Sequence, residues 1–285
     1  MAFGGQAVVI QARGKKSSRL AREMFCDSRS CDFKSQRQPI RLADLPDGRL
    51  TLTYFDAASR NSSCQKTGSL GTIALSLWSA VQYLLCQSCD QGLMLHAGAV
   101  VFRDTMFIFP GPSGVGKTTL TATLVARGGI YLSDELVFVD KRSQLSSGLT
   151  RPLNIKFHGL AAIQSFLVDN WEKHIVKTSV GYFVPHRMFH EENWVYPRPE
   201  RKISSIIFIR KFSPGPFRLR PMSNAEATAM LMSCLINARN LEESGLLLCK
   251  ALASVVSKFS LECDNEETVP VAVNRLLATI FCGDD

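Results

Sequence analysis

The sequence predicts an α/β fold in which strands and helices alternate around a glycine-rich loop. Two apolar runs of strand length, Leu93–Phe102 and Thr105–Pro110, are separated only by Arg103-Asp104, which predicts a tight turn. The second run leads directly into the glycine-rich segment Gly111–Thr118, and a helix is predicted over Thr119–Ala126. This order of strand, loop and helix is typical of a layered α/β domain.

The spacing of apolar residues divides the rest of the chain into further strands and helices. The predicted strands are Thr51–Phe55, Ile130–Leu132, Leu136–Val139 and Ser204–Arg210, and the predicted helices are Leu70–Leu85, Asn224–Asn237, Leu241–Lys258 and Val271–Phe281. The first fifty residues are polar and rich in turn residues, without a predicted element. We expect a small N-terminal α+β subdomain over residues 1–90 and a larger domain with the glycine-rich loop over residues 91–285.

The composition is that of a folded protein without a polybasic arm. Of the 285 residues, 46% are hydrophobic and 20% are charged, and the net charge of +8 is spread along the chain. No block of five or more like charges occurs, so we expect no nucleic-acid partner. The longest apolar window, Leu70–Cys86, is interrupted by polar residues, and the N-terminal residues lack the order of a secretory signal. We therefore expect a cytoplasmic protein without a membrane segment.

The cysteines leave two interpretations open. Nine cysteines form an odd set without a disulfide framework, which favours a reducing compartment. The pair Cys86-x-x-Cys89 could join Cys26 and Cys31 as four thiolate ligands of zinc. We favour buried free thiols, because Cys86 falls in the last turn of an amphipathic helix and the spacing of the other pair is loose.

The glycine-rich segment is a complete Walker A motif, or P-loop, Gly-x-x-x-x-Gly-Lys-Thr. Glycines let the backbone curl so that successive amides face an anion, and the following helix adds its free N-terminal amides. Lys117 is expected to reach the β- and γ-phosphates, and the Thr118 hydroxyl to bind Mg²⁺. The sequence therefore predicts a site for ATP or GTP with Mg²⁺, formed by Gly111, Ser113, Gly114, Val115, Gly116, Lys117, Thr118 and Thr119.

Two features that flank the P-loop narrow the class of protein. His96 lies in the predicted strand before the P-loop strand, within Leu95-His96-Ala97-Gly98. The acidic pair Asp134-Glu135 ends the strand after the P-loop helix. Carboxylates next to a bound nucleotide are the groups that phosphoryl transfer needs, because they accept a hydroxyl proton and hold Mg²⁺.

In this order of motifs the sequence resembles the HPr kinase/phosphorylase family. Its members carry a histidine in a strand before the loop, a Gly-x-Ser-Gly-x-Gly-Lys-Ser/Thr loop, a short helix ending in Arg-Gly and an acidic pair on the next strand. The resemblance covers roughly His96–Asp140 strongly. It looks closer to shorter relatives that phosphorylate serine on peptides, such as the lasso-peptide tailoring kinases, than to the enzymes that act on HPr. It implies a P-loop kinase core of the HPr kinase and phosphoenolpyruvate carboxykinase type.

The resemblance also implies roles for the flanking residues. Asp134 would be the general base for the acceptor hydroxyl, Glu135 would help to hold Mg²⁺, and His96 would line the site near the transferred phosphoryl group. The family usually shows two aspartates, so Glu135 departs from the pattern. The Glu-x-Arg-Gly and Pro-Gly-Arg-Asn segments of HPr kinases are absent, so phosphorylase activity and HPr as partner are not implied. The candidates for contacts to phosphate or substrate are Lys156, Arg198 and Arg201.

The leading hypothesis is a kinase that acts on a serine hydroxyl of a peptide or protein substrate, for instance a biosynthetic precursor peptide. A small-molecule kinase and a P-loop NTPase switch without an acceptor remain alternatives. The polar and aromatic stretch Val184–Tyr196 is a hypothetical lid or peptide-docking segment. HPr kinases form hexamers, so the resemblance makes a homo-oligomer plausible.

Overall fold

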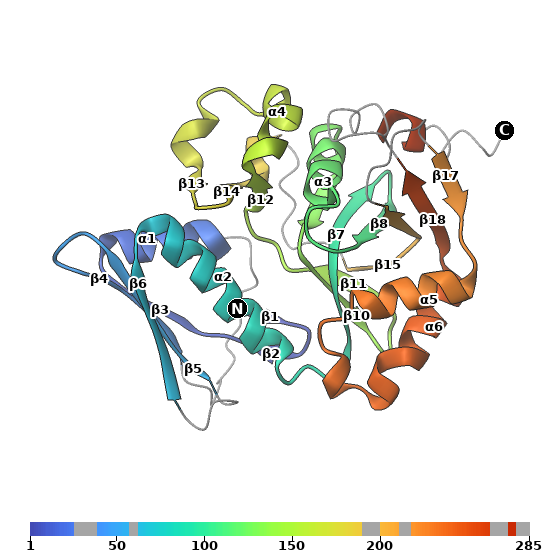
Figure 1. Cartoon of the computed structure of the whole chain (residues 1–285), viewed down its shortest axis with the longest axis horizontal. Helices are drawn as coiled ribbons and strands as arrows, with labels where there is room; N and C mark the ends of the chain where they lie inside the picture. Colours follow the sequence, from blue (N-terminus) through green and yellow to red (C-terminus); the bar gives the residue numbers. More distant parts are fainter. Residues whose placement is uncertain (26–38, 57–61, 190–199, 211–217, 263–272, 278–285) are drawn as a thin grey trace.

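The computed structural model of the chain describes residues 1–25, 39–56, 62–189, 200–210, 218–262 and 273–277. The α/β prediction is confirmed, since helices cover both faces of a mixed sheet (Figure 1). Within the described residues this central sheet has nine strands in the order β15-β11-β10-β7-β8-β16-β18-β17, with β9 also paired to β7. The strands are β7 Gly92–Phe102, β8 Thr105–Pro110, β9 Ile130–Ser133, β10 Leu136–Asp140, β11 Leu145–Gly148, β15 Arg201–Lys202, β16 Ser205–Ile209, β17 Arg218–Pro221 and β18 Ser257–Glu262.

Strand β7 is the longest strand of this sheet and has three antiparallel partners. Its first half pairs with β10, its second half pairs with β9, and β8 pairs alongside residues 97–102. The turn from β7 to β8 is made by Arg103 and Asp104 with φ of 47° and 62°, as a two-residue hairpin requires. The change of partner from β9 to β10 takes place at residues 133–136, where the acidic pair lies.

The alternation of side chains along β7 sorts them onto two faces. One set packs toward helices α5 (Asn224–Ser233) and α6 (Leu246–Val255) and comprises Leu93, Leu95, Ala97, Ala99 and Val101. Val100 and Phe102 point to the opposite face, into the core beneath helix α3 (Lys117–Ala126). Because side chains alternate with a period of two, His96 belongs to the face that carries α3 and the P-loop.

Helix α3 lies close to β7 because a glycine stands between them. A Cβ atom at Gly98 would come within 2.5 Å of Thr121 Oγ1 in the middle of α3. Thr121 is itself fully buried. The absence of a side chain at Gly98 therefore sets how near the first turn of α3 lies to the neighbouring strand positions.

The N-terminal part forms a separate sheet of four strands among the described residues, in the order β3-β4-β5-β6 (Figure 1). Its strands are β3 Ile10–Arg13, β4 Ile40–Asp44, β5 Leu50–Asp56 and β6 Ser62–Gly68, its helices are α1 Lys15–Phe25 and α2 Leu70–Cys86, and a short pair, β1 Ala2–Phe3 and β2 Gln6–Ala7, precedes them. The sequence patterns identify none of the elements before Thr51. Short strands with alternating exposed positions leave too weak an apolar pattern to be detected.

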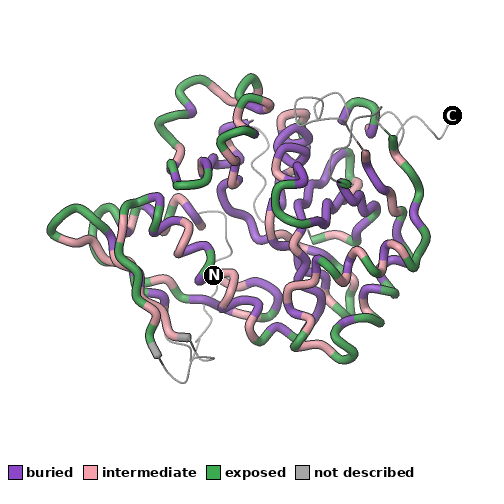
Figure 2. Tube along the Cα trace, in the orientation of Figure 1, coloured by how far each residue is buried: buried purple, intermediate pink, exposed green. Residues whose placement is uncertain are grey.

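The N-terminal core does not stop at the expected boundary after residue 90. Side chains of α2 share one buried cluster with Met94 of β7, Leu136 and Phe138 of β10, and Phe183. Phe183 belongs to a smaller sheet, ordered β12-β14-β13, whose strands are β12 Leu153–Lys156, β13 Val176–Lys177 and β14 Gly181–Val184. Figure 2 shows the buried positions gathered in the central sheet and α3. The division into residues 1–90 and 91–285 stays a prediction.

Three further elements differ from expectation. Helix α5 ends at Ser233, and the helix expected over residues 241–258 is only α6, preceded by a 3-10 turn at Glu242–Gly245. The residues that follow α6 in the sequence form β18. The sequence did not reveal this strand, because its apolar positions continue the helical spacing. Residues 273–277 are helical, and both ends of the predicted terminal helix lie outside the described residues. No helix in the described parts of the chain is long and apolar enough to cross a membrane.

Replacing Gly98 by alanine tests the close approach of α3. The added methyl group meets Thr121 Oγ1 at 2.5 Å, so we expect a loss of about 1–3 kcal/mol in the free energy of unfolding, measured in urea. The double variant Gly98→Ala with Thr121→Ala removes the clashing atom and should recover most of that loss. A Gly98→Ala protein as stable as the unchanged one would contradict this account.

Candidate functional site

The P-loop has the geometry of an anion-binding turn. Gly114 and Gly116 have φ of 89° and 95°, a region that residues with a side chain seldom adopt. Gly116 is the N-cap of α3 and offers no side-chain hydrogen bond to the first turn. The amides at the start of α3 are therefore available to a ligand, and the helix dipole favours an anionic one.

Lys117 is the first residue of α3, and its side chain is held by the loop itself. Its Nζ atom donates hydrogen bonds of 2.8 Å to the carbonyls of Gly111 and Pro112. Burial lowers the pKa of Lys117 below its ordinary value, although the carboxylates of Glu135 and Asp134 act in the opposite direction. The ammonium group thus lies at the base of the loop.

The acidic pair is positioned by the turn between β9 and β10. The Ser133 hydroxyl accepts hydrogen bonds from the amides of Glu135 and Leu136 and donates one to the Leu149 carbonyl. The Glu135 carbonyl accepts a hydrogen bond from the amide of Ala97 in β7. These contacts place both carboxylates one strand away from the P-loop.

Asp134 is almost completely buried and its two oxygens are fully engaged. Among the described residues, four donors reach them at 3.0–3.2 Å: the Thr118 and Tyr131 hydroxyls, the backbone amide of Asn154 and Arg151 Nη2. The contact between Thr118 and Asp134 joins the predicted metal-binding hydroxyl to a carboxylate. Asp134 therefore lies on the side of the site where Thr118 and the helix start.

Glu135 faces the other way, toward His96, and its side chain is 25% exposed. His96 Nε2 lies 3.2 Å from Glu135 Oε1, and Arg151 Nη2 lies 3.2 Å from Oε2. Burial alone would raise the pKa of Glu135, but the hydrogen bond of His96 and the charges of Arg151, His96 and Lys117 outweigh it and lower the pKa to about 2. Glu135 is therefore anionic at neutral pH and accessible from the pocket.

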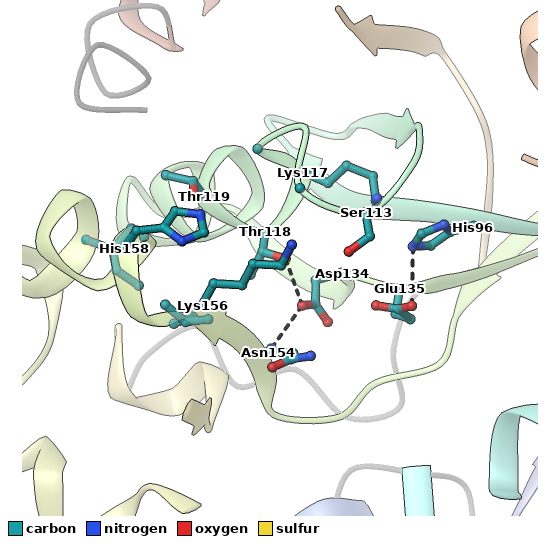
Figure 3. A pocket seen from close by; sticks show the side chains of 15 residues that line it. His96, Ser113, Lys117, Thr118, Thr119, Asp134, Glu135, Asn154, Lys156 and His158 are labelled. Atoms are coloured by element: carbon teal, nitrogen blue, oxygen red, sulfur yellow. Dashed lines mark hydrogen bonds and ion pairs between the residues drawn. The ribbon is translucent and has the colours of Figure 1, made fainter. Parts of the chain in front are cut away.

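These groups line one pocket between α3, β7, the acidic turn and β12 (Figure 3). Lys156 and His158 close it on the side of the small sheet, and the Lys156 side chain extends toward the loop. A Cβ atom at Gly114 would lie 3.1 Å from Lys156 Nζ, so this second ammonium group lies directly over the P-loop. The pocket thus combines a cationic loop end with two carboxylates, as binding of a phosphate chain and Mg²⁺ requires.

The oxygen atoms around Asp134 fit a magnesium ion. Asn154 Oδ1 is buried and has no hydrogen-bond partner within the described residues, although the Asn154 amide contacts Asp134. Mg²⁺ prefers oxygen ligands and commonly takes one or two carboxylates together with phosphate and water. Thr118 Oγ1 and Asn154 Oδ1 would hold it, with Asp134 accepting the hydrogen bond of the Thr118 hydroxyl beside it, and the ion would neutralise charge on the phosphate oxygens.

The comparisons with known proteins do not identify a family for this chain. No protein-family model matches the chain, and no curated protein matches it either. Among solved structures, the chain is similar to the Hpr(Ser) kinase/phosphatase from Coxiella burnetii, at 10% sequence identity and a TM-score of 0.33. That similarity covers 67% of this chain and 97% of the other. A likeness of this size carries no argument about activity.

Most of the predicted site residues share the pocket. Those that line it are His96, Ser113, Gly114, Gly116, Lys117, Thr118, Thr119, Asp134 and Glu135. Gly111 and Val115 do not line it, since Gly111 serves as acceptor for Lys117 and the Val115 side chain packs in the core. Lys156 lies in the pocket, whereas Arg201 pairs with Asp104 at the far end of β8. Arg198 lies outside the described residues.

The expected lid is not supported where it can be followed. Val184, His186, Met188 and Phe189 are buried, and the His186 ring stacks on Tyr131 at 5.2 Å. Residues 190–196 of that stretch lie outside the described residues. Cys86 and Cys89 are buried free thiols, and burial raises the pKa of Cys86 to about 12. Cys26 and Cys31 also lie outside the described residues.

Sequence reasoning missed two residues of the site, Arg151 and Asn154. Both lie in the segment that follows β11, where the Glu-x-Arg-Gly motif of HPr kinases is absent. The segment offers no spacing signal, because Arg151 meets the acidic pair only through the pairing of β10 with β11 and the packing of the small sheet. An arginine followed by proline within an apolar run was the available hint, since such a charge needs a buried partner.

The low pKa of Glu135 predicts a pH dependence of stability. Because the pKa in the folded protein is about 2, below the ordinary 4.5, the stabilising contribution is present above pH 4.5 and is lost as the pH falls toward 2. The stability difference between the unchanged protein and Glu135→Gln should shrink over that window, by up to roughly 3 kcal/mol. Urea unfolding without nucleotide at pH 6 to 2.5 measures it, with the exposed Glu172→Gln as control. A constant difference would contradict the charge environment described.

Proposed function

We propose that the protein is a nucleotide-dependent phosphotransferase with a P-loop kinase core of the HPr kinase type, using ATP or GTP with Mg²⁺. The observation that carries this proposal is the single pocket in which the P-loop, Lys117 and two differently surrounded carboxylates meet. Phosphoryl transfer needs little beyond an aligned acceptor, charge neutralisation on the phosphate and a carboxylate near the hydroxyl. The pocket supplies the cationic groups and the carboxylates among these requirements.

The donor nucleotide would bind with its phosphates against the P-loop. The amides around Gly114 and Gly116 and the first turn of α3 supply hydrogen bonds, and Lys117 exchanges its contacts with Gly111 and Pro112 for the phosphate oxygens. Lys156 approaches the same anion from β12. Two ammonium groups on opposite sides of the phosphates then offset their negative charge as it shifts during transfer.

The surroundings of the two carboxylates favour an exchange of the roles that the family resemblance implies. Asp134 is buried and saturated by donors, so it suits the metal side next to Thr118 rather than a proton acceptor. Glu135 is open to the pocket, and among the described residues its carboxylate is held by His96 and Arg151. We assign to Glu135 the orientation of the acceptor hydroxyl and the acceptance of its proton.

A pKa of about 2 is compatible with that role. Loose phosphoryl transfer depends more on orientation and electrostatics than on a strong base. Negative phosphates bound near Glu135 also disfavour its ionised form and raise its proton affinity in the complex. His96 contacts Oε1 of Glu135 and fixes the orientation of this carboxylate, which would then accept the proton of the acceptor hydroxyl.

For the acceptor we propose a serine hydroxyl of a peptide or protein. The support is the resemblance of His96, the P-loop and the acidic pair to kinases that phosphorylate serine. A small-molecule acceptor and simple NTP hydrolysis are the competing outcomes. They differ in where the labelled phosphoryl group ends: on a peptide, on a metabolite or as free phosphate.

Three substitutions separate the proposed roles. Lys117→Ala should weaken nucleotide binding by about tenfold or more, because a charge-assisted contact is lost. Asp134→Asn and Glu135→Gln should keep most of the binding and lower transfer by about 100-fold or more. Only Asp134→Asn should raise the Mg²⁺ concentration needed for half-maximal rate. Calorimetry and rates over a Mg²⁺ series measure these effects, with Glu172→Gln as control. Full activity of Glu135→Gln would refute its assigned role.

The acceptor is identified by a direct transfer assay. The protein is incubated with Mg²⁺ and γ-labelled ATP or GTP, together with the products of its neighbouring genes, and phosphate is located by mass spectrometry. We expect phosphoserine on a peptide or protein, absent with Lys117→Ala. Release of inorganic phosphate at the same rate with and without every acceptor would contradict the kinase proposal and favour an NTPase.

A further inference from the structure

Arg151 lies at the point where the acidic pair meets the rest of the molecule. It stands between β11 and β12, and its side chain is fully buried. The same nitrogen, Nη2, lies 3.2 Å from Asp134 Oδ1 and 3.2 Å from Glu135 Oε2. The other terminal nitrogen, Nη1, donates a hydrogen bond of 2.7 Å to the Pro152 carbonyl. One cation therefore contacts both carboxylates.

The guanidinium group is also held by aromatic rings. Its Cζ atom lies 4.3 Å from the ring centroid of Trp78 in α2 and 5.5 Å from that of Phe183 in β14. A cation over a ring face is attracted to it, and a planar guanidinium stacks in a way that an ammonium group does not. The orientation of Arg151 thus depends on two elements outside the P-loop and its strand.

Stability alone does not account for this residue. Arg151 Nε is buried without a hydrogen-bond partner in the described part of the chain. A buried charge with an unmet donor is costly, and apolar replacements of buried ion pairs are often equally stable. What only the cation supplies is a fixed counter-charge for two carboxylates that point into the pocket.

Helix α2 is tightly seated on the small sheet that borders the pocket. Gly71 of α2 lies so close to the Lys177 carbonyl of β13 that no Cβ atom fits between them. Strand β13 pairs with β14, and β14 pairs with β12, which carries Asn154 and Lys156. Trp78 is therefore presented to Arg151 by a helix whose position is linked to the pocket wall.

We infer that Arg151 is a positioning residue for the proposed phosphoryl transfer: stacked on Trp78, it holds Asp134 and Glu135 in place. The site is thereby linked to the packing of α2, a helix of the N-terminal part. This inference rests on the proposed function for its kinetic consequence. Its structural consequence, the placement of Asp134 in the ligand-free protein, does not depend on that function.

The amide proton of Asn154 reports this placement directly. Its nitrogen lies 3.1 Å from Asp134 Oδ2, and it belongs to β12, whose ladder to β14 contains neither carboxylate. If Arg151 holds Asp134 in place, its loss frees this amide and leaves the ladder intact. Hydrogen exchange of the ligand-free protein, followed residue by residue by NMR, separates the Asn154 amide from the other amides of β12 and β14.

The experiment compares Arg151→Met, Arg151→Lys and Trp78→Leu with two matched controls. Arg127→Met removes another arginine stacked on a ring, that of Phe166 at 5.7 Å, at the far end of α3. Trp171→Leu removes another buried indole, in the core beneath α3. We expect exchange at Asn154 to accelerate about tenfold or more in Arg151→Met and Trp78→Leu, and less in Arg151→Lys, which keeps the charge. The controls should change all amides of β12 alike.

Rates with MgATP supply the second readout. We expect Arg151→Met and Trp78→Leu to lose about tenfold or more in kcat, and Arg151→Lys to lose less, each with a KM for MgATP within about threefold, because ground-state binding is not affected. Unchanged exchange at Asn154 in both Trp78→Leu and Arg151→Lys would overturn the inference. These two variants are sufficient for the test if Arg151→Met does not fold. If the unchanged protein transfers no phosphate but the variants still alter exchange at Asn154, the proposed function is contradicted and the positioning role of Arg151 is retained.

Discussion

Two neighbouring carboxylates, one buried and one at the pocket wall, need positive charge around them, and this requirement organises the centre of the molecule. Asp134 and Glu135 are adjacent in sequence, and two neighbouring negative charges repel each other unless cations balance them. Arg151 lies 3.2 Å from an oxygen of each, and Lys117 and His96 lie on the pocket side. The two carboxylates therefore share a positively charged environment, in which Asp134 is buried and Glu135 is open to the pocket.

The surrounding framework serves to bring these charges together from distant parts of the chain. Strand β7 carries His96 on the face of α3, and Gly98 lets that helix approach closely enough for Lys117 to share the pocket. The Ser133 hydroxyl holds the turn in which the strand partner of β7 changes from β9 to β10. Each contact is modest in energy, but together they leave the carboxylates a single arrangement.

That arrangement gives two chemically similar side chains different tasks. Asp134 has every oxygen engaged and shares a contact with Thr118, whereas Glu135 opens to the pocket beside His96. Unequal surroundings are a general way to divide roles between neighbouring carboxylates. The N-terminal part takes part in this division, since Trp78 of α2 lies on the guanidinium group that contacts both. The core that spans the expected domain boundary is the physical basis of that link.

The sequence by itself determined what is local. The hairpin of β7 and β8, the P-loop, helix α3 and the acidic turn all follow from short-range patterns, because turns, apolar alternation and glycine conformations act within a few residues. The exposed pattern of β3 and β4 and the strand β18 escaped notice, since helical and strand spacing overlap in short segments. Arg151, Asn154 and Trp78 could not be assigned to the site at all. Their meeting with Asp134 and Glu135 depends on how three sheets pack, and packing between segments far apart in the chain leaves no regular spacing to detect. The roles of the two carboxylates likewise depend on the donors around each, and only the tertiary structure decides which donors those are.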